Sequence, residues 1–338
     1  MEPKSKAAAA SCFLVMSLLC SCVIGDDQME TNNQGLSYNY YEKTCPKVEE
    51  IVRSSLSSMF ILDPSSPAAL LRLMFHDCQV QGCDASILIE PSGDNHQFTE
   101  IDSVKNFGIR KRDLIGVIKT SLETECPKQV SCSDIIILAA REAVSLTGGP
   151  LIPVPLGRKD TLSTPSKHVA DSHLPPSTAD VDSILSLFDG KGMTIEESVA
   201  IMGSHTLGVT HCNNVLSRFD NANATSENMD PHFQTFLRVV CPEFSPSSKA
   251  AEATFVPNDQ TSLIFDTAYY DDAIAGRGNL RIDSEIGADP RTRPFVEAFA
   301  ADQNRFFNAF SSAFVKLSSY KVLTGSDGVV RSVCDKVD

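Results

Sequence analysis

Apolar residues recur at steps of three and four along much of this chain, and that spacing limits its fold more than any other feature. Residues spaced in this way lie on one face of an α-helix and can bury that face together. The clearest runs are Val48, Ile51, Val52, Leu56, Met59 and Phe60, then Leu114, Ile115, Val117, Ile118 and Leu122, and then Val181, Ile184, Leu185 and Phe188. Thr194 and Glu197 match a capping box, which predicts a helix start. Because the alternation typical of strands is scarce, the sequence predicts a mostly α-helical domain.

The first 25 residues have the pattern of a secretory signal peptide. Lys4 and Lys6 precede an apolar run, and the small residue Gly25 lies just before an acidic pair. A membrane anchor is the alternative, but the run contains several Ser and Cys residues and is short for a span. No later segment is apolar enough to cross a bilayer, and no repeat or long linker occurs. We therefore expect a signal peptide over residues 1–25 and a single secreted domain over residues 26–338.

The cysteines fit an oxidising compartment. Of the 11 cysteines, three lie in the predicted signal peptide, which leaves an even number for disulfides. Sequence alone does not pair them, although Cys78 and Cys83 are close enough to close a small loop. The remaining eight are Cys45, Cys78, Cys83, Cys126, Cys132, Cys212, Cys241 and Cys334.

The balance of charge argues against several classes of partner. The formal net charge is −14 at pH 7, with 43 Asp and Glu residues against 29 Lys and Arg residues. Such an acidic chain repels nucleic acid and anionic membrane surfaces. We therefore expect neither nucleic acid nor a membrane as a partner.

The stretch RLMFHDCQVQGCDAS, residues 72–86, combines groups that suit proton transfer. In a helix, Arg72 and His76 lie one turn apart on the same face, with Phe75 beside them. A guanidinium next to an imidazole lowers the imidazole pKa and leaves the ring able to accept a proton. This pair suits the cleavage of a small polar bond, although an Arg and a His at this spacing are more often ordinary surface residues.

The same stretch also allows a metal site. His76, Cys78 and Cys83 are soft ligands, but zinc sites usually have tighter cysteine spacing and a fourth ligand nearby. Oxygen atoms form a better set, which resembles a loop for a hard cation. This set consists of the Asp77, Asp84 and Ser86 side chains and the backbone carbonyls near Val80 and Gly82. An ordinary acidic turn remains the alternative.

A second histidine stretch is GSHTLG, residues 203–208. His205 follows an apolar segment between glycines that let other groups approach closely. It is either a core histidine or an axial haem ligand whose other ring nitrogen needs an acceptor. Because no C-x-x-C-H motif occurs, any haem would be bound non-covalently. Ser204 is a poor nucleophile candidate, since the pattern is not G-x-S-x-G.

The two histidine stretches together resemble the class III secretory plant peroxidases, the horseradish peroxidase type. The similarity runs from about Leu36 to Cys334 through motifs in the order and spacing of the family. The motifs are YYEKTCP, RLMFHDCQVQGCDAS, SCSDIIILAAREAV, VPLGRKD, GSHTLG and IFDTAYY. The resemblance implies the haem-dependent plant peroxidase fold, with helices in a distal and a proximal half that enclose one haem b and with few short strands. It also implies reduction of hydrogen peroxide to water, while phenolic donors are oxidised in successive one-electron steps.

Residue roles follow from the resemblance on the distal side. His76 is implied as the acid and base, and Arg72 as its charge-stabilising partner. Phe75 would wall the iron off from direct substrate contact. Asn106 corresponds to an amide that hydrogen-bonds the distal histidine and tunes its basicity.

On the proximal side, the resemblance implies His205 as the axial ligand of the haem iron. Asp283 corresponds to the carboxylate that accepts the N–H of the proximal histidine. Pro175, in HLPPS, matches the edge where aromatic donors bind.

Two calcium ions are implied in the same way. The distal ligands would be Asp77, Val80, Gly82, Asp84 and Ser86, with Glu100 acting through water. The proximal ligands would be Thr206, Asn258, Thr261, Ile264 and Asp266. Asn258 stands where the family usually has Asp, so the proximal ion loses one formal charge and should bind more weakly.

The resemblance further implies four disulfides, which are Cys45–Cys126, Cys78–Cys83, Cys132–Cys334 and Cys212–Cys241. The only glycosylation acceptor is Asn223, in Asn-Ala-Thr. The segment after Asn106 departs from the family: Ile109 replaces a serine that often reaches a haem propionate, and His211 replaces a glutamine near the other. We therefore hypothesise that the basic residues Arg110, Lys111 and Arg112 pair with the propionates.

We expect a monomer in the extracellular space or cell wall. A vacuolar location is less favoured, because only four residues follow Cys334. Two alternatives remain open. One is a secreted peroxidase-like protein that binds haem but turns over weakly, which the altered propionate contacts and Asn258 motivate. The other is a secreted calcium-binding structural protein without haem.

Overall fold

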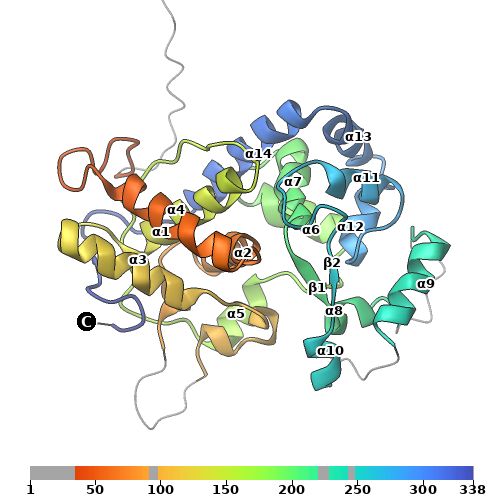
Figure 1. Cartoon of the computed structure of the whole chain (residues 1–338), viewed down its shortest axis with the longest axis horizontal. Helices are drawn as coiled ribbons and strands as arrows, with labels where there is room; N and C mark the ends of the chain where they lie inside the picture. Colours follow the sequence, from red (N-terminus) through yellow and green to blue (C-terminus); the bar gives the residue numbers. More distant parts are fainter. Residues whose placement is uncertain (1–34, 91–97, 220–227, 243–247, 338) are drawn as a thin grey trace, which may run out of the picture. The chain divides into compact units, whose positions relative to one another are not determined.

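Helices build most of the molecule, as the apolar spacing predicts (Figure 1). The structure is a computed structural model and describes residues 35–90, 98–219, 228–242 and 248–337. These residues belong to one compact unit. None of the helices within those ranges has the length and apolar character needed to cross a bilayer.

The elements follow one another along the chain with few strands. In the first half they are α1 (Val48–Leu62), α2 (Ser66–Gln79), α3 (Arg112–Glu125), α4 (Cys132–Leu146), α5 (Lys167–His173), and the 3₁₀ helices η1 (Ser86–Leu88), η2 (Glu100–Asp102) and η3 (Val104–Asn106). In the second half they are α6 (Val181–Asp189), α7 (Ile195–Met202), η4 (Gly203–Thr206), β1 (Val209–His211), α8 (Cys212–Leu216), α9 (Pro231–Val240), α10 (Lys249–Ala253), β2 (Phe255–Pro257), α11 (Ala268–Ile274), α12 (Arg281–Glu285), α13 (Arg293–Ala301) and α14 (Gln303–Ser318).

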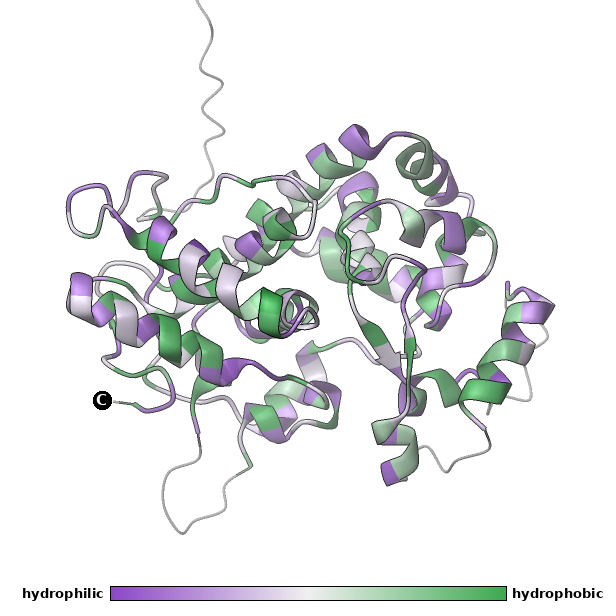
Figure 2. Cartoon of the chain, in the orientation of Figure 1, coloured by the Kyte–Doolittle hydropathy of each residue, from purple (hydrophilic) through white to green (hydrophobic). Residues whose placement is uncertain are grey.

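Helix α4 is the centre of the first group of helices. Its side chains from Cys132 to Val144 are buried, and α1, α2 and α3 pack against it. Ser131 caps the helix by accepting a hydrogen bond from the Asp134 N–H at 3.1 Å. Figure 2 shows apolar and hydrophilic residues alternating along the surrounding helices, which is the amphipathic pattern of helices around a core.

Aromatic residues hold the second group together. Helix α14 packs on α7, α13 and α2, and Phe306, Phe310 and Phe314 on it are fully buried. Phe265 stacks on Phe306 with 5.4 Å between ring centroids. The capping box before α7 is confirmed, because Thr194 Oγ1 accepts from the Glu197 N–H and the Glu197 carboxylate accepts from the Thr194 N–H.

Strands β1 and β2 form a short antiparallel pair in which Val209 faces Pro257 and His211 faces Phe255. The described residues also form four disulfides. They are Cys45–Cys126, Cys78–Cys83, Cys132–Cys334 and Cys212–Cys241, the same pairs that the family resemblance implies.

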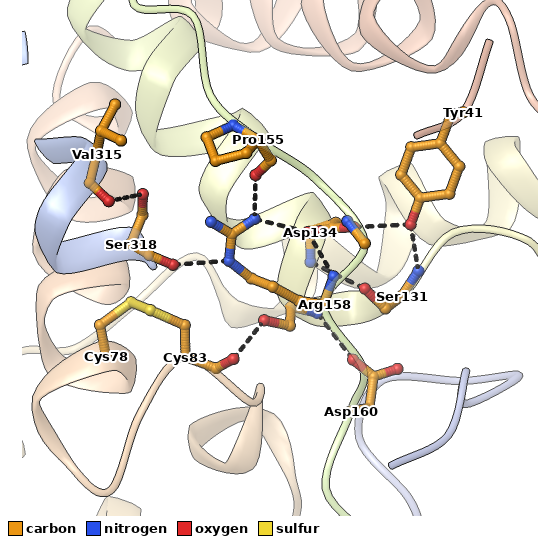
Figure 3. A network of polar contacts seen from close by, with 12 residues as sticks. Tyr41, Cys78, Cys83, Ser131, Asp134, Pro155, Arg158, Asp160, Val315 and Ser318 are labelled. Atoms are coloured by element: carbon orange, nitrogen blue, oxygen red, sulfur yellow. Dashed lines mark hydrogen bonds and ion pairs between the residues drawn. A yellow bond between two sulfur atoms is a disulfide. The ribbon is translucent and has the colours of Figure 1, made fainter. Parts of the chain in front are cut away.

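A buried ion pair joins the two groups of helices (Figure 3). Arg158 and Asp134 have no exposed surface and approach to 2.8 Å. Arg158 Nε also donates to the Ser318 carbonyl at the end of α14, and the Tyr41 hydroxyl donates to Asp134. Buried charges of this kind are stable only when they are paired and hydrogen-bonded. The pair therefore holds α4, the loop after α4 and the end of α14 in one arrangement.

We predict that Asp134→Asn lowers the free energy of unfolding by about 3–5 kcal/mol, because it leaves the Arg158 charge buried without its partner. Chemical denaturation of the disulfide-intact protein measures this loss. The control is Glu297→Gln, which removes half of an exposed pair with Arg293 and should cost at most about 1 kcal/mol. Equal small losses in both variants would contradict the role given to the buried pair.

Candidate active site

One face of α2 presents the first half of the site. Arg72 and His76 lie one turn apart on this helix, and His76 Nδ1 lies 2.6 Å from Asn106 Oδ1. The amide nitrogen of Asn106 donates to the Glu100 carbonyl at 2.7 Å. This second bond orients the amide so that its oxygen faces the imidazole, which makes His76 Nδ1 the donor. In a neutral ring, His76 Nε2 is then the acceptor.

The surroundings of His76 keep the ring neutral. Burial and the positive charge of Arg72 hold the pKa of His76 well below its ordinary value, although the hydrogen bond to Asn106 acts in the opposite direction. Phe75 lies edge-on to the ring, with 5.8 Å between the centroids. The result is a neutral base beside a cation and an aromatic ring.

The Arg72 guanidinium is fixed by backbone carbonyls. It donates to Phe107 O at 2.9 Å and to Lys105 O at 3.2 Å. Burial lowers the pKa of Arg72 to about 10, so the group stays charged at neutral pH. Gly108 leaves room beside it: its φ is +80°, and a Cβ there would lie 3.3 Å from Arg72 Nη1 and 3.8 Å from His211 Nε2.

The second half of the site comes from the segment after α7. His205 Nδ1 lies 2.8 Å from Asp283 Oδ1. Asp283 also accepts from the Tyr269 hydroxyl at 3.0 Å and from the Leu280 N–H at 3.0 Å. Burial alone would lower the pKa of His205, but the charge of Asp283 and its hydrogen bond outweigh burial and raise it. Three hydrogen bonds thus fix the carboxylate that orients this imidazole.

The charge of Arg72 links the two halves of the site. The His205 side chain is 36 % exposed although protein surrounds it, and the Arg72 charge is close enough to act on its pKa. In the described part of the chain, neither His76 Nε2 nor His205 Nε2 has a protein hydrogen-bond partner. A haem fits this donor set, because one imidazole nitrogen is free to bind iron and the opposite one is free to handle protons.

Acidic side chains gather at the C-terminal end of α2. Asp77 Oδ1 and Glu100 Oε1 are buried without a partner, while the Ser86 hydroxyl donates to Glu100 at 2.9 Å. Burial, followed by the charges of Asp84 and Glu100, raises the pKa of Asp77 well above its ordinary value. Burial also raises the pKa of Glu100 to about 8 and that of Asp84 to about 6. The charge of Arg331 lowers the pKa of Asp77 and of Asp84 but does not offset their burial, so a bound cation fits the cluster.

Carboxylates alone would not complete a cation site at this cluster. No three His, Cys, Asp or Glu side chains within the described ranges converge as a metal site. Hydroxyl and backbone carbonyl oxygens, such as those of Val80 and Gly82 in the loop after α2, would have to supply the remaining ligands. This donor chemistry is that of calcium rather than zinc.

A second oxygen cluster lies beside His205. The Thr206 hydroxyl lies 3.2 Å from Asp266 Oδ1, and the Thr261 hydroxyl lies 3.0 Å from the same atom. Ile264 follows in the same turn, where its N–H donates to the Thr261 carbonyl at 2.6 Å. The structure gives Asn258 other partners, and Asp259 contacts both threonines instead.

Pro175 lies half-buried just after α5. Lys105 holds this segment, because its ammonium group donates to the carbonyls of Asp171 and Leu174 at 2.5 Å each. The backbone of Lys105 also accepts from Arg72. One residue therefore links the expected donor edge to the guanidinium.

The hypothesis that three basic residues pair with the haem propionates is not supported. Lys111 pairs with Asp63 at 2.8 Å, and Arg112 pairs with Glu90 at 2.7 Å. The Arg110 guanidinium donates to the Ser65 carbonyl at 2.8 Å. The three basic residues thus attach the start of α3 to neighbouring loops. Their partners in the structure are the carboxylates of Asp63 and Glu90 and the carbonyl of Ser65.

Sequence reasoning missed the roles of Tyr269, Lys105 and Asp259. Tyr269 lies within the motif IFDTAYY, which marks the segment but not its contact with Asp283. Lys105 and Asp259 leave no signal in the sequence, because their partners are distant in the chain or depend on the register of a loop. Asn223 and residues 1–25 lie outside the described residues.

Comparison with known proteins assigns the family. The peroxidase family model matches residues 52–302. Peroxidase 29 of Arabidopsis thaliana is 88 % identical over the whole of both chains. Peroxidase 28 of the same plant is 41 % identical, covering 88 % of this chain and 92 % of that one, and Peroxidase 63 is 38 % identical, covering 96 % and 97 %. The chain belongs to the peroxidase family as a class III plant peroxidase, an enzyme that acts on hydrogen peroxide.

We predict that Arg72→Leu slows the reaction with peroxide by about 100-fold or more, because a developing negative charge loses its cation. The same change removes a charge that lowers the pKa of His76. The pKa of His76 should therefore rise. In a plot of the rate constant for the peroxide reaction against pH, the fall in rate at acidic pH should then begin at a higher pH. Stopped-flow rates across the acidic range measure both effects, with Arg305→Leu on the exposed side of α14 as the control. A fall in rate that begins at the original pH would refute the coupling.

Proposed function

We propose that this peroxidase is a secreted enzyme that binds one haem b non-covalently through His205 and oxidises small phenolic donors. The carrying observation is the pair of imidazoles, each hydrogen-bonded at Nδ1 and free at Nε2. Such a pair separates iron binding from proton handling. When bound, the haem would supply the redox centre that accepts two oxidising equivalents from peroxide and returns them one at a time.

His76 and Arg72 would carry out the proton chemistry. Neutral His76 accepts a proton at Nε2 from the oxygen of hydrogen peroxide that remains at the centre. As the O–O bond breaks, His76 returns that proton to the other oxygen, which leaves as water. The Arg72 guanidinium stabilises the negative charge that develops on the leaving oxygen. Asn106 keeps the His76 ring in the tautomer that this sequence needs.

Asp283 and Tyr269 would tune the iron ligand. Asp283 accepts from His205 Nδ1 and pushes electron density toward Nε2, the atom that would bind iron. The Tyr269 hydroxyl would limit this transfer of electron density, because it donates to the same Asp283 oxygen and reduces the negative charge that acts on His205. The donors would bind at the edge near Pro175, which Lys105 holds in place, and Phe75 would keep them from the iron.

We propose calcium as the cation at both oxygen clusters. The distal ion would bind Asp77, Val80, Gly82, Asp84 and Ser86, with Glu100 acting through water. The proximal ion would bind Thr206, Thr261, Ile264 and Asp266. The distal ion would act on the active site through Glu100, whose carbonyl holds the Asn106 amide.

We place the enzyme outside the cell, in the extracellular space or cell wall, as a monomer. The predicted signal peptide over residues 1–25, the predicted single domain over residues 26–338 and four disulfides support export. Asn223 would carry the glycan.

We predict that His76→Ala slows the reaction with peroxide by about 10³- to 10⁵-fold while the haem absorption band remains, because acid–base catalysis and orientation are lost together. Absorption spectra with and without peroxide measure both properties. His168→Ala, an exposed histidine on α5, is the control and should react like the parent enzyme.

Other outcomes would separate the alternatives. Undiminished reaction with peroxide in His76→Ala would refute the role of His76. A parent protein with haem but no peroxide-dependent oxidation of phenols would be a haem-binding protein with weak turnover. A parent protein without any haem band would be a calcium-binding structural protein.

We predict that a calcium chelator lowers the melting temperature of the enzyme by roughly 5 °C, since an ion at about 100 times its Kd stabilises a fold by about 2.7 kcal/mol. The reason is that Asp77 Oδ1 and Glu100 Oε1, which are buried without a protein partner, would lose the charge of the ion. Thermal melting with and without chelator measures the shift. In Asp77→Asn the chelator should have a smaller effect, whereas the exposed variant Glu42→Gln should respond like the parent. A melting temperature that ignores the chelator would contradict the calcium sites.

A further inference from the structure

The oxygen cluster beside His205 contains a carboxylate that the family pattern does not assign. Asp259 Oδ2 lies 2.6 Å from the Thr206 hydroxyl, and Asp259 Oδ1 lies 3.3 Å from the Thr261 hydroxyl. Asp266 Oδ1 also contacts these two hydroxyls, at 3.2 Å from that of Thr206 and 3.0 Å from that of Thr261. Asp259 is only 6 % exposed and Thr206 is fully buried. Two carboxylates and two hydroxyls therefore converge in an interior position.

The protons in this cluster are too few for its oxygens. Each threonine hydroxyl has one proton and can donate to one carboxylate at a time. Each hydroxyl nevertheless lies within 3.3 Å of both Asp259 and Asp266. Two of the four close oxygen pairs therefore have no proton between them. A hard cation resolves this shortage, because it binds carboxylate and hydroxyl oxygens together.

Asn258, at the position implied as a ligand, already uses its amide elsewhere. Its Oδ1 accepts from the Thr210 hydroxyl at 2.7 Å, and its Nδ2 donates to the Leu207 carbonyl at 2.9 Å. The Asn258 N–H also donates to the Gly208 carbonyl at 3.1 Å. These bonds attach the end of β2 to the segment that runs from His205 into β1. The role of Asn258 is thus to join two backbone segments.

We infer that Asp259, and not Asn258, supplies the missing acidic ligand of the proximal calcium ion, so that the site has moved by one residue along the chain. This inference rests on the calcium proposed for that site. The shift restores the formal charge that the exchange of Asp for Asn removes. The proximal ion should then bind with the strength of a site that has two carboxylates.

The test compares Asp259→Asn with Asn258→Ala in the full haem-loaded enzyme. Calcium content after desalting and calcium titration by calorimetry are the readouts, and neither depends on activity. We expect two ions in the parent. Asp259→Asn should keep the distal ion and bind the proximal one at least about tenfold more weakly, because a ligand charge is lost. Asn258→Ala should retain both ions. Asp259→Asn is isosteric, and circular dichroism and the haem band confirm its folding.

Each outcome decides a different point. Unchanged calcium binding in Asp259→Asn, or loss of one ion in Asn258→Ala, would overturn the assignment of Asp259 while leaving the calcium site in place. If Asp259→Asn does not accumulate, the calcium content of Asn258→Ala decides the assignment alone. A parent enzyme with one ion, which disappears in Asp77→Asn, would show that no proximal ion binds. That result would overturn both the inference and the proposed proximal site.

Discussion

The fixed C-terminal end of α2 is the constraint on which the rest of the site depends. Three consecutive residues there carry different tasks: His76 faces Asn106, Asp77 faces the distal oxygen cluster, and Cys78 is bonded to Cys83. The Asp77 carboxylate accepts from the Ala85 N–H at 3.1 Å, which folds the following loop back onto the helix. The loop is in turn held to α4, because the Ser133 hydroxyl donates to the Cys83 carbonyl. A helix end that would otherwise fray therefore becomes a rigid support for an imidazole.

The pKa values of the two imidazoles shift in opposite directions because their partners differ in charge. His76 Nδ1 donates to a neutral amide, and burial together with Arg72 lowers its pKa. His205 Nδ1 donates to the Asp283 carboxylate, which raises the pKa of that ring despite burial. The first ring is therefore a weak base that can release a proton again. The second ring would be an electron-rich ligand for the proposed haem iron. Both assignments depend on hydrogen bonds across large separations in the chain, from α2 to η3 and from η4 to α12.

Much of the fold and part of the site follow from local sequence patterns. The helical class and the Thr194 capping box depend on spacing within a few residues, and Arg72 and His76 share a face because of helical periodicity. Pairing of distant groups depends on tertiary packing, so the contacts of Tyr269 with Asp283 and of Lys105 with Leu174 could not be predicted. Asn258 and Asp259 show the limit most clearly. Motif spacing indicates Asn258 as the calcium ligand. The Asn258 amide, however, bonds to the segment that leads into β1, whereas the Asp259 carboxylate faces Thr206.

The protonation state of the His76 ring is the most direct test of its role as the base that accepts the first proton. Nitrogen-15 NMR of the histidine rings at neutral pH reports which ring nitrogen carries the proton. We expect a neutral His76 ring with a proton on Nδ1, donated to Asn106, and none on Nε2. A doubly protonated ring, or a neutral ring with its proton on Nε2, would contradict it, because neither form can accept the first proton from peroxide.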